Sequence, residues 1–163
     1  MERRQIGLKL VMDQLGLPVK VDSFDDRLVL QKATYLAQAA GLNLGYYYRW
    51  YLRGPYCPKV AEDGFAIAAA LSQGLDEAKN WSLDASSSAK LGGIRCLLRG
   101  HGQASRAKRL ELLASVHFLM DRRQVTGRDP RQIAGTLRRF NKLFSESEVA
   151  SAIREIETHA LLA

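Results

Sequence analysis

The amino-acid sequence predicts a mostly α-helical fold: a single compact domain, residues 1–163, of six or seven helices with at most a small two-stranded β-hairpin. Apolar residues recur at helical spacing through most of the chain, and capping signals coincide with the starts of those segments. Only one long stretch, residues 46–52, alternates with the period of a strand. With 163 residues, 47% hydrophobic and 25% charged, the chain has the size and composition of one soluble globular domain.

The first two helices are expected at residues 2–15 and 24–40. Gly16 and Gly41 suit the left-handed position after a helix, and Ser23 with Asp26 forms a capping box before the second one. The apolar face of the first helix carries Ile6, Leu10, Val11 and Leu15. In the second, we expect an inward set of Phe24, Leu28, Ala33, Leu36, Ala37 and Ala40, with Gln31, Lys32 and Gln38 largely outside it.

An aromatic segment and a rigid turn follow these helices. Residues 46–52 alternate as a strand would, and residues 80–83 are a second strand candidate; if the two pair, they form a small antiparallel sheet beside the helices. Between them lies a turn in which two prolines fix the backbone and remove two donors: Gly54-Pro55-Tyr56-Cys57-Pro58. Stiffness of this kind in a loop points to a packed core or to a recognition surface.

The remaining helices are expected at residues 59–73, 89–98, 106–123, 130–141 and 146–161, with residues 74–88 as a connecting segment. Gly92 and Gly93 weaken the helix at 89–98 by about 2 kcal/mol relative to two alanines. Asp129, followed by Pro130 and Gln132, is typical of an N-cap with a capping box. Ser145 with Glu148 marks the start of the last helix in the same way.

Positive charge gathers in one half of the chain. Residues 95–142 hold twelve Arg or Lys against three acidic residues, a net charge of +9, whereas the rest of the chain carries −2. Such a segment either meets nucleic acid or an acidic partner, or forms a solvated helical surface. Under the nucleic-acid alternative, the binding residues are Arg95, Arg99, Arg106, Lys108, Arg109, Arg122 and Arg123.

Signals of catalysis and of metal binding are weak. The three histidines lie far apart in sequence, so no metal site is expected, and His117 is interpreted as a hydrogen-bonded core residue. Cys57 is interpreted as a small buried hydrophobe. Arg95 and His101 are six positions apart, which resembles the Arg-x(4–6)-His signature of HEPN ribonucleases and leaves ribonuclease activity as a remote alternative. We expect no enzyme activity and no cofactor.

The two cysteines form no CxxC pair, and no secretory signal or membrane-spanning run is recognisable. These features predict a cytoplasmic protein with reduced thiols and no contact with a membrane. The oligomeric state is left open.

Two motifs stand out in the first half of the chain: Leu30-Gln31-Lys32-Ala33-Thr34-Tyr35-Leu36, and Trp50-Tyr51-Leu52-Arg53-Gly54-Pro55-Tyr56-Cys57-Pro58 with Asp63. Together they resemble the pattern of the Panacea domain, the family of SocA-like antitoxins and phage-associated proteins. Residues 110–119 and 142–148 are similar to the related YwgA-like group. The chain departs from the pattern at Cys57, where serine is usual. The resemblance implies a compact helical fold and, for antitoxin members, neutralisation of a toxin by direct binding; SocA-like members also deliver the toxin to a protease.

From these observations we expect a non-catalytic, protein-binding module, antitoxin-like or accessory to phage defence, that holds a protein partner through the aromatic turn and the adjacent helices. The residues expected to contact the partner are Tyr47, Trp50, Tyr51, Arg53, Pro55, Tyr56 and Pro58. The alternative is a nucleic-acid-binding protein that uses the basic segment 95–142.

Overall fold

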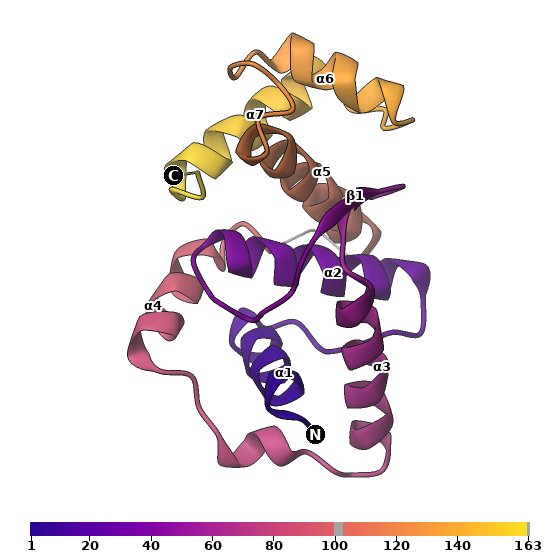
Figure 1. Ribbon diagram of the computed structural model, residues 1–163, viewed down its shortest axis with the longest axis vertical. Coiled ribbons are helices and arrows are strands. Elements are labelled where there is room, and N and C mark those ends of the chain that lie inside the picture. Colours follow the sequence, from indigo (N-terminus) through magenta and orange to yellow (C-terminus); the bar gives the residue numbers. More distant parts are fainter. Residues whose placement is uncertain (100–102, 163) are drawn as a thin grey trace.

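The computed structural model describes residues 1–99 and 103–162, without the side chains of residues 103–105. In this part of the chain, seven α-helices and one two-stranded antiparallel sheet confirm the expected mostly α-helical fold with a small hairpin (Figure 1). The elements in chain order are α1 (Arg3–Leu15), α2 (Phe24–Ala39), β1 (Arg49–Tyr51), β2 (Gly54–Tyr56), α3 (Pro58–Ser72), the 3₁₀ helix η1 (Glu77–Asn80), α4 (Ala85–Ile94), α5 (Gln103–Asp121), α6 (Pro130–Arg139) and α7 (Glu146–Thr158).

The helix starts follow the local capping chemistry. Reciprocal capping boxes form at Ser23 with Asp26 and at Ser145 with Glu148, as predicted. Asp129 caps α6 by accepting a hydrogen bond from the Arg131 amide. The predicted box partner Gln132 does not reach back to this cap, because its side-chain amide donates to Thr126 Oγ1.

Helix α2 is the central element of the fold. It packs against α1, α3, α4, α5 and β2, and in Figure 1 it runs between α1 and α3 on one side and α5 on the other. Ten consecutive residues, from Leu28 to Ala37, are buried. The expectation that Gln31 and Lys32 lie outside the apolar stripe is therefore wrong, because a helix surrounded by neighbours has no solvent face along this length. Phe24 was expected to point inward, yet it is 53% exposed in the first turn.

The hairpin forms between neighbouring segments, not between distant ones. Arg49 pairs with Tyr56, Trp50 with Pro55, and Tyr51 with Gly54. The predicted partner at residues 80–83 is wrong: residues 77–80 form η1 instead, and Asp76 caps it. A positive φ of +82° at Gly54 lets the chain reverse within two residues, so the segment after the turn becomes the strand partner.

Helices α6 and α7 pack against each other and against α5. The start of α4 also differs from the expectation, since the helix covers Ala85–Ile94 and begins at the Asp84 cap, within the segment predicted as a connection. No helix among the described residues is both long and apolar enough to cross a lipid bilayer.

Candidate functional site

Two side chains of α2 hold the rigid turn in place. The side-chain amide of Gln31 donates from Nε2 to the carbonyl of Cys57 (2.8 Å) and accepts from the Cys57 amide at Oε1 (3.1 Å). Lys32 Nζ donates to the carbonyl of Pro55 at 2.6 Å. All of these atoms are buried, so the bonds satisfy backbone groups that water does not reach. The turn is thereby fixed to the central helix of the fold.

A cluster of charged side chains lies beneath the hairpin. Lys142 Nζ donates to Glu111 Oε1 at 2.5 Å, and both side chains are buried. Arg53 Nη1 lies 3.6 Å from Glu111 Oε2. Lys32 is only 1% exposed, and burial, together with the charge of Lys142, lowers its pKa to about 7, against the opposing effect of Glu111. Burial also lowers the pKa of Lys142, although its hydrogen bond to Glu111 acts in the opposite direction.

The free energy of unfolding is expected to rise with pH between about 7 and about 9. Lys32 releases its proton near pH 7 in the folded state but near pH 10.4 in the unfolded chain, so raising the pH in this interval favours the folded state. The stability gained by deprotonation of Lys32 is fully present above the pKa of Lys32 in the unfolded chain, and it is lost as the pH falls towards 7. Urea titrations at both ends of the interval give the change in the free energy of unfolding with pH. This change should be smaller in Lys32→Met than in the parent. Parallel pH profiles for the two proteins would contradict the assignment.

The hairpin also makes close contact with α5. A Cβ added to Gly54 would lie 2.3 Å from Ser115 Oγ, so no larger residue fits there without displacement. The Trp50 ring packs against Phe118 and Phe140, with centroid distances of 5.8 and 4.8 Å. Trp50 Nε1 and Ser115 Oγ are buried without a hydrogen-bond partner among the described residues. Trp50 and Pro55, both expected to contact a partner, therefore serve mainly to pack the hairpin onto the fold.

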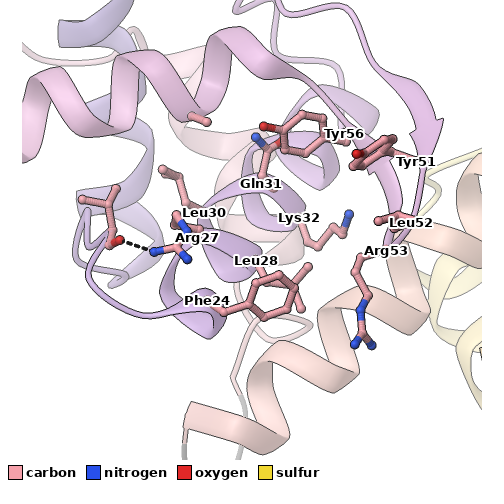
Figure 2. Close-up of a pocket in the computed structure, with 12 residues that line it drawn as sticks. Phe24, Arg27, Leu28, Leu30, Gln31, Lys32, Tyr51, Leu52, Arg53 and Tyr56 are labelled. Atoms are coloured by element: carbon pink, nitrogen blue, oxygen red, sulfur yellow. Dashed lines mark hydrogen bonds between the residues drawn. The ribbon is translucent and has the colours of Figure 1, made fainter.

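A cavity of about 470 Å³ opens between the hairpin, α2 and α3. In Figure 2 the rings of Tyr51 and Tyr56 lie on one side of it and that of Phe24 on the other, with side chains of α2 between them. The lining is mainly apolar and includes Val21, Phe24, Leu28, Leu30, Tyr51, Leu52, Tyr56 and Ala61, together with the polar Arg27, Gln31, Lys32 and Arg53. A volume of this size falls within the range of ligand pockets, about 300–1,000 Å³.

Exposed hydrophobic side chains gather around this cavity. Nine large hydrophobic residues are exposed in the described part of the chain, and five of them surround the hairpin. Three of the five line the cavity: Phe24, Tyr51 and Leu52. Leu143 lines an adjoining hollow, and Phe140 packs against Trp50. A contiguous apolar patch on a protein surface is typical of an interaction site, whereas single exposed residues are common everywhere.

The structure separates the predicted partner-binding residues into groups. Tyr51, Arg53 and Tyr56 come together at the cavity. Tyr47 is 88% exposed but lines a different hollow, formed with Tyr35, Gln38 and His117. Pro58 is exposed at the first position of α3, where its fixed φ starts the helix.

The predicted nucleic-acid-binding residues do not form one surface. Arg106 and Arg122 stand at opposite ends of α5, about 24 Å apart along the axis at 1.5 Å per residue. Arg109 donates to the carbonyl of Leu97 and pairs with Glu155, so its charge is already engaged. Arg95 lies near Gly16, after α1. Arg106 is half-buried, and its Nε is fully buried. The remaining residues of the set are exposed: Arg99, Lys108, Arg122 and Arg123.

His117 is a hydrogen-bonded core residue, as predicted. Its Nδ1 bonds the hydroxyl of Tyr35 and its Nε2 the carbonyl of Leu161, both at 2.7 Å, and burial lowers its pKa. His159 Nε2 lies 3.4 Å from Cys96 Sγ, a proximity that the sequence did not indicate. No group of three metal-ligating side chains occurs in the described residues. His101, which forms the ribonuclease-like spacing with Arg95, lies outside the described residues.

Asp63 of α3 is fully buried. It accepts hydrogen bonds from Arg4 (2.8 Å), Gln5 (3.3 Å) and the Tyr46 hydroxyl (2.9 Å). Burial opposes its ionisation, but the hydrogen bonds from Arg4, Tyr46 and Gln5 outweigh this effect and lower its pKa. Asp63 thereby joins α1, α3 and the segment before β1.

In comparisons with known proteins, no family model, no curated protein and no solved structure matches the chain.

Sequence reasoning missed Phe24, Leu28 and Leu52 as part of the site. Phe24 and Leu28 were assigned to the helix interior, and Leu52 to a strand face. In the structure, Leu52 and Arg53 occupy the two positions between the strands, where side chains project into solvent. Their neighbours from α2 could not be identified without the tertiary arrangement.

Proposed function

We propose that the protein is a non-catalytic binding module that holds a partner protein at the surface around the hairpin cavity. The observation that carries this proposal is the group of exposed hydrophobic side chains around one well-formed cavity. Aromatic residues at the centre of such a patch are typical binding anchors, since they offer large contact areas with few rotatable bonds. Tyr51 and Tyr56 fit this role, with rings 5.5 Å apart.

The rigidity of the surface also supports binding. Gln31 and Lys32 of α2 bind the backbone of the turn, and Trp50 of β1 packs on Phe118 of α5, so little conformational freedom is lost when a partner docks. The resemblance to SocA-like antitoxins would make the partner a toxin or another defence protein, in a cytoplasmic setting. Nucleic-acid binding is the weaker candidate, because the arginines of residues 95–142 are dispersed and some are already paired.

The proposal can be tested by cross-linking in cells of the source organism, purification of the bound protein, and titration of that protein against variants. We expect Leu52→Glu to weaken binding by about 30-fold, the ~2 kcal/mol of an interface hot spot. Tyr47→Glu is the matched control, because it places the same charge at an exposed hydrophobic position outside the cavity. Equal losses in the two variants, or duplex DNA as the tighter ligand at physiological salt, would refute the proposal.

A further inference from the structure

The charges around the hairpin cavity are unbalanced. Three cationic side chains line it (Arg27, Lys32 and Arg53), and none of its lining residues is acidic. Arg27 is engaged, since one of its terminal nitrogens donates to the carbonyls of Val21 and Asp22 and the carboxylate of Asp26 attracts its charge. Arg53 is 59% exposed and lies over the Phe24 ring, with its guanidinium carbon 5.7 Å from the centroid. The cavity therefore presents an apolar interior with a guanidinium group at its opening.

The imbalance extends into the protein beneath the hairpin. Glu111 is the carboxylate that faces Arg53 and Lys142, and it also acts electrostatically on Lys32, so one negative charge serves three basic groups. The adjoining hollow adds Asp25 and Lys108, one charge of each sign, and so leaves the excess unchanged. Buried charges in proteins are normally paired, because an unpaired one is costly to remove from water. The low pKa of Lys32 is a sign of this cost.

The surroundings of the cavity indicate the size of what covers it. Phe24, Tyr51 and Leu52 are each more than half exposed at its opening, and Leu143 is 78% exposed at the adjoining hollow. A small solute inside the cavity would leave these side chains in water. A polypeptide segment can fill the cavity and cover them at the same time, which is the usual arrangement of an anchor residue within a surrounding apolar ring.

We propose that the occupant is an acidic segment of a partner protein, which inserts one large apolar side chain into the cavity and places a carboxylate against Arg53. This inference rests on the proposed function and specifies the chemistry of the partner. The carboxylate of the partner supplies negative charge to a set of basic side chains that shares only Glu111. The guanidinium group of Arg53 can bind this carboxylate through two parallel hydrogen bonds. A basic segment of the same shape would be repelled by the same charges.

The test uses the full-length protein and two synthetic peptides of equal length, each with a Leu-Leu centre, flanked by glutamates in one and by lysines in the other. Calorimetry should show at least about tenfold tighter binding of the glutamate peptide, equivalent to ~1.4 kcal/mol, and increasing salt should reduce this preference. Amide chemical shifts should change at Phe24, Leu52 and Arg53.

Charge reversal then locates the effect. Arg53→Glu should abolish the preference for the glutamate peptide or transfer it to the lysine peptide. Arg154→Glu, an equal change of charge at an exposed position of α7, should retain it. Arg53→Gln, which adds no negative charge beside Glu111, guards against a loss caused by misfolding, and thermal unfolding of each variant checks the fold.

Three outcomes would overturn the inference: equal affinity for the two peptides, an equal effect of the two charge reversals, or no binding of the glutamate peptide. A natural partner that depends on Leu52 but not on Arg53 would leave the proposed function standing and reject only the acidic segment. A natural partner whose binding depends on neither Leu52 nor Arg53 would reject both the acidic segment and the proposed function.

Discussion

Replacement of Gly54 by alanine is expected to destabilise the fold by about 3 kcal/mol, from left-handed strain and from overpacking. The residue has φ = +82°, and an added Cβ would lie 2.3 Å from Ser115 Oγ. Ser115 is fully buried in α5, so either its hydroxyl rotates into packed surroundings or the hairpin shifts away from the helix. The free energy of unfolding, measured by urea denaturation, should show the loss.

Two companion variants separate the causes of this loss. Gly74→Ala has nearly the same φ of +74° but no atom within 4 Å of the added Cβ, so it should cost only the backbone strain of about 1 kcal/mol. Adding Ser115→Ala to Gly54→Ala removes the clashing hydroxyl and should recover part of the stability. If Gly54→Ala and Gly74→Ala have equal costs, the close packing of the hairpin on α5 is wrong.

Replacement of Glu111 by glutamine is expected to destabilise the fold by about 3 kcal/mol or more, the cost of removing one partner of a buried ion pair. Glu111 is the carboxylate that pairs with buried Lys142 and faces Arg53. Without its negative charge, Lys142 and Lys32 remain buried next to each other with no compensation. Chemical denaturation at a pH below 7, where Lys32 is also protonated, should show the largest effect.

The matched control is Glu62→Gln, which removes a carboxylate paired with Lys59 at the surface. It should change stability by less than about 0.5 kcal/mol, because solvent screens exposed pairs. The double variant Glu111→Leu with Lys142→Met replaces both buried charges by apolar groups of similar size and should regain much of the loss. A cost for Glu111→Gln no larger than that of Glu62→Gln would show that the cluster is well hydrated.

The helices were predictable because their signals are local. Ser23 with Asp26, Ser145 with Glu148, and Gly16 each act within one turn of the chain, and all three adopt the expected cap geometry. The strand partner was not predictable in this way. Residues 80–83 and 54–56 are both short, and the choice between them depends on the backbone reversal at Gly54 and on the surface of α5 that receives it.

The candidate site was only partly predictable. Tyr51, Arg53 and Tyr56 follow from the aromatic run and the rigid turn, and the structure brings them together. The polar residues of α2 were expected at the solvent-facing side of the helix, because a periodicity argument assumes that one face of a helix meets water. Gln31 and Lys32 are polar yet buried, since the backbone groups of the turn are their binding partners. Such partners become visible only in three dimensions.

The bond between Gln31 and residue 57 has a further consequence for how the turn tolerates change. The Gln31 side chain binds the amide and the carbonyl of Cys57, as a neighbouring strand would, and makes no use of the thiol. The identity of residue 57 is thus constrained by volume and polarity at a buried position, not by the interaction that anchors it. Small residues are interchangeable there in principle, whereas position 31 requires a side chain that offers a donor and an acceptor at once, which restricts it to an amide of this length.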